Sequence, residues 1–275
     1  MPLDQPQVPT ERKGADMSFL DHLEALRWHL VRSAIAVLVF GTICFIYVDL
    51  IFDGVVLKPL NPDFITYRVF CKMSHLLFND ESMCFSKVNM QLISIQMAGQ
   101  FTMHLTASIV AGMIISFPYI AWEIWRFLKP ALYDKERQSA SGLVFFLSVL
   151  FLLGIGFGYF IITPLSVTFF GNYHISESID NQINLSSYIG LVTSTTLWCG
   201  IVFELPLVIY FLSKFGIVTP KWLRDQRRLM YVIILILSAI ITPPDVVSQI
   251  IVSLPLFVLY EIGIFISART QKTIA

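Results

Sequence analysis

The sequence predicts an all-α polytopic membrane protein with six transmembrane helices, both termini in the cytoplasm and two short final spans. Of its 275 residues, 56% are hydrophobic and only 14% are charged. Several uncharged runs exceed the ~18 residues that mark a membrane span, and they lack the alternation typical of barrel strands. Because every backbone polar group must be satisfied inside the bilayer, a bundle of helices is the expected architecture.

The chain is expected to form one membrane domain, residues 18–269, between two cytoplasmic tails, 1–17 and 270–275. The first tail is polar, contains prolines and lacks the apolar core of a signal peptide, so we expect it to be disordered. Ser18 and Asp21 have the spacing of a capping box, which predicts that a helix begins there. An apolar stripe then leads into a first span at about residues 30–48.

The loop 49–96 is polar enough to lie outside the membrane, and it contains Cys71 and Cys84. In an oxidising compartment these two cysteines can close a loop of about 14 residues, which is worth roughly 3 kcal/mol. The alternative is two unpaired thiols. Cys44 and Cys199 lie inside apolar runs, where we expect them to serve only in packing.

The uncharged run 88–122 is longer than one span requires, which predicts a short interfacial helix followed by a second span near 101–120. A charged loop, 123–142, and a third span near 143–164 follow. Gly154 and Gly158 form a GxxxG pair inside the third span, which predicts the close approach of another helix.

The fourth span, residues 188–213, contains a single charged side chain, Glu204. A carboxylate near the bilayer centre costs about 2.5–3.5 kcal/mol on insertion scales, so we expect Glu204 to face a protein interior, a wet cavity or a partner. The alternative is that Glu204 lies near the cytoplasmic end of the span and extends its carboxylate toward water.

After a basic loop, 214–228, two apolar stretches remain, 229–244 and 246–260, separated by a tight turn at 242–245. A helix of sixteen residues measures about 24 Å, which is less than the ~30 Å of the hydrocarbon core. Two short final spans are therefore expected.

The distribution of positive charge predicts the orientation. Of the 19 lysines and arginines, 15 fall in the N-terminal segment, the second and fourth loops and the C-terminal tail. The other four lie in the first loop. By the positive-inside rule both termini are cytoplasmic and the loop with Cys71 and Cys84 is exterior.

No motif of a metalloprotease, a serine hydrolase or a phosphate-binding loop is present, and His22 and His29 lack a third ligand for a metal ion. We therefore expect no enzymatic activity, no metal and no cofactor. The zero net charge provides no basic excess for binding nucleic acid.

Four segments in this order resemble the TatC family of twin-arginine translocase proteins: SFLDHLEALRWHLVR (18–32), FLKPALYDKER (127–137), FELPLVIYFLSKFGIVTP (203–220) and ITPPDVVSQIIVSLPLFVLYEIG (241–263). The similarity extends from about residue 18 to residue 269. It implies a core receptor in the bacterial inner membrane that binds twin-arginine signal peptides of folded precursor proteins. It also implies assembly with single-span partners of the TatA/TatB type, as a homo-oligomer within the complex, and export driven by the proton-motive force.

The resemblance also implies roles for particular residues. The signal-peptide positions are Glu24, Arg27, Phe127, Pro130, Glu136 and Arg137. The polar positions in the membrane that are associated with partner docking are Glu204, Thr242 and Gln249. The exterior loop positions are Pro59 and Asp245.

Two adjacent arginines in a peptide need anionic partners, and bidentate pairing with carboxylates is the strongest arrangement available. Glu24 and Glu136 are the cytoplasmic candidates. The family usually has an acid where this chain has Ala25, and Glu24 lies one residue earlier, about 100° round the helix. The alternative for each acid is ordinary pairing on a helix surface, for example Glu24 with Arg27.

A proton- or ion-coupled secondary transporter that uses Glu204 as its protonatable site is the alternative function. Such transporters often contain two repeated halves, and no repeat relates the first three predicted spans to the last three. A structural membrane scaffold is a third interpretation, and it would leave Glu204 without a role.

Overall fold

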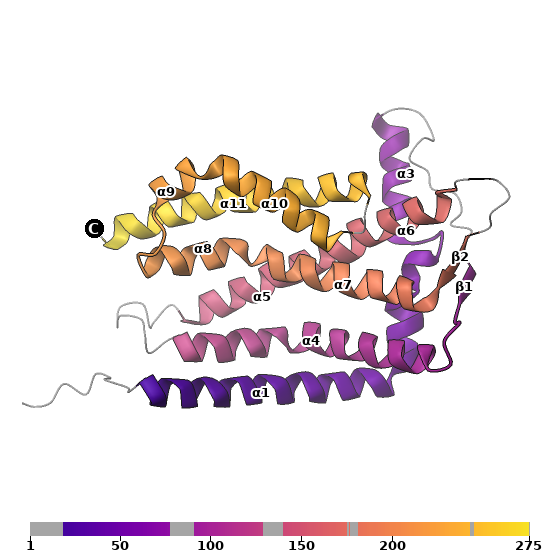
Figure 1. Ribbon diagram of the computed structural model, residues 1–275, viewed down its shortest axis with the longest axis horizontal. Coiled ribbons are helices and arrows are strands. Elements are labelled where there is room, and N and C mark those ends of the chain that lie inside the picture. The colour runs from indigo at the N-terminus through magenta and orange to yellow at the C-terminus, as the bar shows by residue number, and fades with distance from the viewer. Residues whose placement is uncertain are drawn as a thin grey trace, which may run out of the picture.

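The computed structural model describes residues 19–77, 91–128, 140–174, 176, 181–242 and 245–274. Long helices run side by side and form a bundle, and α3 (Ile65–Leu77) stands across them at one end (Figure 1). The start of α1 (Phe19–Ile46) and the end of α11 (Val246–Ile274) both lie at the opposite end (Figure 1). Ser18, the predicted N-cap, lies just outside the described residues.

In the part of the chain that the structure describes, five helical stretches are long and apolar enough to cross a membrane. They are Glu24–Ile46, Gly99–Phe127, Gly142–Asn172, Leu185–Lys214 and Val246–Gln271. The prediction of a helical, multi-pass membrane protein is confirmed.

The first two of these stretches pack along each other as α1 and α4 (Gly99–Leu128). At their crossing, a Cβ atom added to Gly112 would lie 2.4 Å from the backbone nitrogen of Gly41. Only glycine at this position permits the two backbones to come so close.

The third span is longer than predicted, because α5 (Ala140–Phe157) continues through a π-helical segment, Gly158–Ile162, into α6 (Thr163–Asn172). A Cβ atom on Gly154 would lie 2.6 Å from the carbonyl oxygen of Cys199, on the neighbouring α7 (Leu185–Phe203). A Cβ atom on Gly158 would lie 2.9 Å from the Cα atom of Thr196. The close approach predicted from the GxxxG pair is confirmed.

The predicted loop beginning at residue 123 is wrong, because α4 continues to Leu128. The charge of Glu123 does not end the helix, since the side chain is buried and has partners on α1 and on its own helix. The interfacial helix predicted before the second span is also wrong. Instead, β1 (Gln91–Ile93) pairs in parallel with β2 (Gln182–Asn184), a segment far away in sequence.

The fourth span is interrupted. Helix α7 ends at Phe203, and α8 (Leu205–Lys214) begins one residue after Glu204. Pro206, in the first turn of α8, has no backbone N–H to donate to the preceding turn, which explains the break.

One of the two final spans is short and the other is not. Helix α9 (Pro220–Asp225) lies in the basic loop, and α10 (Arg227–Ile241) has 15 residues. Helix α11 has 29 residues, so the prediction of a short last span is wrong, and the predicted tail is helical through Ile274. Helix α11 continues past Glu261, whose carboxylate accepts hydrogen bonds from Arg227 at 2.6 Å and Tyr231 at 2.8 Å on α10.

Helix α11 also packs against α8. The hydroxyl of Ser213 donates to that of Ser267 at 2.7 Å, and both side chains are buried. A Cβ atom on Gly263 would lie 2.5 Å from Cδ1 of Ile209. These contacts fix the last helix of the bundle against the second half of the interrupted span.

Short elements follow α1 at the end of the bundle occupied by α3: α2 (Val48–Ile51), a π-helical segment Phe52–Val56 (η1) and a 3₁₀ turn Lys58–Leu60 (η2). Cys71 on α3 is disulfide-bonded, whereas Cys44 and Cys199 are buried free thiols. Cys84, the predicted partner of Cys71, lies outside the described residues, so this pairing stays a prediction.

Candidate functional site

The start of α1 and the end of α4 lie together at one end of the bundle (Figure 1). They place Glu24 and Arg27 near the beginning of α1 and Phe127 in the last turn of α4. The ring of Phe127 contacts the imidazole of His29 edge to face, with 6.1 Å between ring centroids. Three of the predicted signal-peptide residues, Pro130, Glu136 and Arg137, lie outside the described residues.

Glu24 and Arg27 are both exposed. The ion pair that would make them an ordinary helix-surface pair is absent from the described part of the chain. The Glu24 carboxylate is therefore accessible to a ligand at this end of the bundle.

Glu123 on α4 is fully buried and was not among the predicted site residues. Its Oε2 atom forms a hydrogen bond with Nδ1 of His29 on α1. Its Oε1 atom accepts from the Tyr119 hydroxyl at 3.0 Å and from the Arg126 guanidinium at 3.3 Å. Two helices thus share one satisfied carboxylate, one helical turn before Phe127.

Glu204 lies in the break between α7 and α8. Unlike Glu123, its carboxyl group has no hydrogen-bond partner among the described residues. Both carboxyl oxygens are enclosed. The backbone of Phe151 on α5 lies beside the carboxyl without the geometry of a hydrogen bond. A buried polar group without a partner costs about 1–3 kcal/mol, so the site retains an unused capacity for hydrogen bonding.

Thr242 and Gln249 do not share a hydrogen bond with Glu204 in the described part of the chain. The Thr242 hydroxyl donates to the carbonyl oxygen of Ser238 at 2.8 Å, at the end of α10. The Gln249 amide on α11 donates to the carbonyl oxygen of Leu235 on α10 at 3.2 Å. The Gln249 side chain therefore links α11 to α10, whereas the Thr242 hydroxyl bonds only to the last turn of α10.

Pro59 and Asp245 make hydrogen bonds at the end of the bundle that carries α3. The carbonyl oxygen of Pro59 accepts from the hydroxyl of Tyr67 at 2.8 Å, and burial raises the pKa of that hydroxyl. Oδ1 of Asp245 accepts from the backbone N–H of Ser248 at 2.6 Å, which caps α11.

Comparison with known proteins decides the family. A family model described as "Sec-independent protein translocase protein (TatC)" matches residues 21–255. The chain belongs to the TatC family.

Relatives and solved structures cover nearly all of the chain. TatC of Blattabacterium is 38% identical over 258 residues, 94% of this chain and 97% of its own length. TatC of Carboxydothermus hydrogenoformans is 30% identical over 252 residues, covering 91% and 93%. A crystal structure titled as the twin-arginine translocase receptor TatC in DDM has a TM-score of 0.70, with 31% identity over 89% of this chain and 98% of that one.

For this TatC chain, the buried Glu123 is the residue that sequence reasoning missed. One signal in the sequence was available: Tyr119 and Arg126 lie four residues before and three residues after Glu123, so a continued helix puts all three on one face. Spacing cannot indicate the partner on α1, because His29 is 94 residues away from Glu123 in the chain.

Proposed function

We propose that this TatC-family protein is the core receptor subunit of a twin-arginine translocase in the bacterial inner membrane, and that it binds the signal peptides of folded precursors. The family assignment makes it a component of a protein translocase and favours this function over a secondary transporter. The observation that carries the proposal is the exposed carboxylate of Glu24 where α1 begins beside the end of α4.

In this proposal the two signal-peptide arginines pair with Glu24 and Glu136. Phe127, at the end of α4, supplies an aromatic surface on which a guanidinium can stack. Glu123 fixes α1 against α4 and thereby sets the distance between Glu24 on α1 and Phe127 on α4. Arg27, Pro130 and Arg137 complete the predicted surface.

The enclosed carboxyl of Glu204 is proposed as the docking point for a single-span partner of the TatA/TatB type. A polar side chain on the partner helix would satisfy the carboxyl, and the break at Pro206 would leave room for it. Thr242 and Gln249 would border this contact through the α10–α11 connection. Transport itself is proposed to be driven by the proton-motive force.

The proposed topology has six spans, counting the short α10, with both termini in the cytoplasm. The position of the start of α1 and the end of α11 at one end of the bundle supports it (Figure 1). The concentration of lysine and arginine in the segments assigned to that side supports it as well.

Site-specific photocrosslinking from position 136 tests the receptor function. A probe at residue 136 should crosslink to a precursor with a twin-arginine signal peptide and not to the same precursor with twin lysines. Equal crosslinking of both precursors would contradict the proposed recognition of arginine.

A further inference from the structure

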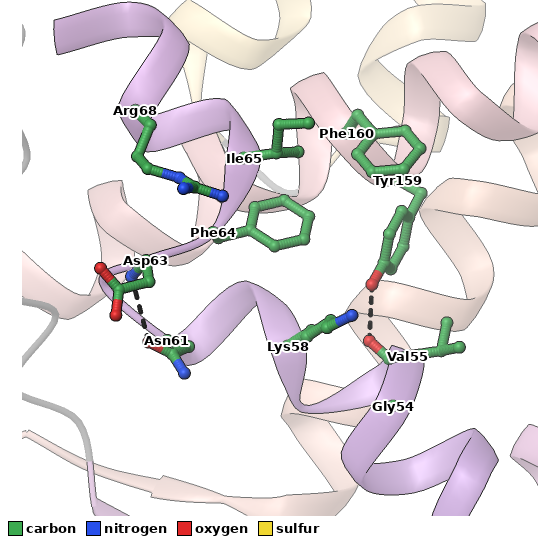
Figure 2. A pocket seen from close by; sticks show the side chains of 10 residues that line it. All are labelled: Gly54, Val55, Lys58, Asn61, Asp63, Phe64, Ile65, Arg68, Tyr159 and Phe160. Carbon is green, nitrogen blue, oxygen red and sulfur yellow. Dashed lines mark hydrogen bonds between the residues drawn. The ribbon is translucent and has the colours of Figure 1, made fainter.

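A cavity of about 630 Å³ opens at the end of the bundle that carries α3, away from the sites described above. Figure 2 shows its lining, which comes from the segment after α1, from the start of α3 and from the π-helical segment of the third span. Its chemistry is set by Lys58, Asp63, Phe64, Arg68, Tyr159 and Phe160.

Two cations, Lys58 and Arg68, enter this cavity from different segments and leave Phe64 between them (Figure 2). Both are exposed, and neither makes an ion pair or a side-chain hydrogen bond within the described residues. The one acid of the lining, Asp63, directs its carboxylate away from Lys58 (Figure 2). The lining therefore has a net charge of +1 and two available cationic groups.

The aromatic wall of the cavity is held in place by its own contacts. The Tyr159 hydroxyl donates to the carbonyl oxygen of Val55 at 2.7 Å (Figure 2). The Phe64 and Phe160 rings are stacked with 5.9 Å between centroids. The cavity is therefore preformed and does not depend on a bound ligand for its shape.

An apolar groove of about 300 Å³ adjoins this cavity, and the two share the lining residues Val55, Tyr159 and Phe160. Its walls come from α4, α5 and α7. On α4 the groove extends from Ala107 to Ile115, about 12 Å along the helix. That length fits within one leaflet, since half of the hydrocarbon core is about 15 Å.

We propose that the cavity and the groove together bind one anionic phospholipid, with its phosphate paired with Lys58 and Arg68 at the cavity and one acyl chain in the adjoining apolar groove. Cations at the edge of a membrane span attract lipid phosphate. The adjoining apolar groove favours a ligand that carries a hydrocarbon chain. A soluble anion would use the cations and leave the groove empty. The site shares no residue with the proposed signal-peptide or partner contacts.

The test uses delipidated protein in detergent, titrated with phosphatidylglycerol and followed by native mass spectrometry. Each of Lys58→Gln and Arg68→Gln should weaken lipid binding about fivefold, and the double variant should weaken it further. The matched control is Lys72→Gln, which removes an exposed cation from the same helix α3, one turn beyond Arg68 and outside the cavity. This control should bind as the wild type does.

A second variant tests the groove without touching charge. Gly156 lines the groove, and a Cβ atom at this position meets no other atom within 4 Å. Gly156→Leu should therefore extend into the groove and reduce lipid binding, whereas Gly156→Ala should have little effect; thermal unfolding of both variants checks that the leucine leaves the fold intact.

Equal lipid binding by the wild type, the double charge variant and Gly156→Leu would overturn the proposal. It would also be overturned if glycerol 3-phosphate or inorganic phosphate bound as strongly as the lipid, because the cations would then form a site for soluble anions. Signal-peptide crosslinking at residue 136 is independent of either result.

Discussion

Two glutamates with enclosed carboxyl groups, Glu123 and Glu204, have opposite surroundings. Glu123 has three polar partners on two helices. The Glu204 carboxyl has none in the described part of the chain. A satisfied carboxylate holds structure together, whereas an unsatisfied one is available to a ligand or partner.

Glu204→Ala is expected to leave signal-peptide binding intact, to weaken assembly with single-span partners and to abolish transport. Glu204→Gln keeps a donor and an acceptor, so its effect should be milder. The hydrogen bond that Glu204→Ala removes is expected to be worth about 0.6–2 kcal/mol, as between other membrane helices. Crosslinking to the partners and a transport assay measure the two effects. Unchanged crosslinking with lost transport would instead favour a role of Glu204 in proton coupling.

Glu123→Ala is expected to lower the free energy of unfolding by about 1–3 kcal/mol, because His29 and Tyr119 lose a buried partner. Glu261→Ala is the matched control, since it breaks the pair with Arg227, in which both side chains are partly exposed, at 39% and 44%. That loss should stay below about 1 kcal/mol. Thermal unfolding in detergent compares the two, and equal losses would show that Glu123 does not hold α1 to α4.

At the scale of helices, the close approach of α5 and α7 was predictable because GxxxG is a local pattern with a direct steric meaning. The break at Glu204 follows from Pro206 in the same local way. The β1–β2 pairing was not predictable, because each strand has three residues and its partner is distant in sequence. The end of α4 could not be predicted from charge, because Glu123 is satisfied inside the bundle by a partner on α1.

Gly154→Ala is expected to destabilise the protein by about 1–3 kcal/mol, because the new methyl group would press on the backbone of Cys199. Gly156→Ala, two residues along the same helix, meets nothing within 4 Å and serves as the control. Unfolding of both variants in the same detergent gives the comparison. Similar stabilities would mean that α5 and α7 can separate without cost.

A disulfide between Cys71, on α3, and Cys84 is expected. Alkylation after reduction should then increase the intact mass by two more alkyl groups than alkylation alone. If the protein has the same mass after alkylation alone and after reduction followed by alkylation, the pairing is ruled out.

At the scale of the whole molecule, the asymmetry of lysine and arginine predicts that both termini are cytoplasmic. The structure places the start of α1 and the end of α11 at one end of the bundle, as an even number of spans requires (Figure 1). The side of the membrane that this end faces stays a prediction. The length of α11 was not predicted, because Glu261 ends the uncharged run in the sequence but does not end the helix.

Cysteines introduced at Ser139 and Gln226 should be labelled only from the cytoplasm, and a cysteine at Ser176 only from outside. Membrane-impermeant reagents on intact and opened cells provide the measurement. Reversed labelling would contradict the six-span topology with cytoplasmic termini.

The pairing of distant helices has a consequence for the order of synthesis. His29 and Glu123 are separated by 94 residues, and Ser213 and Ser267 by 54. At about 5–20 residues per second, each early helix waits several seconds for its partner to be made. A helix satisfies its own backbone in lipid, so it can insert alone during this delay. Changes at Ser267 or Gly263 would therefore act on the final docking of the nascent chain and not on its insertion.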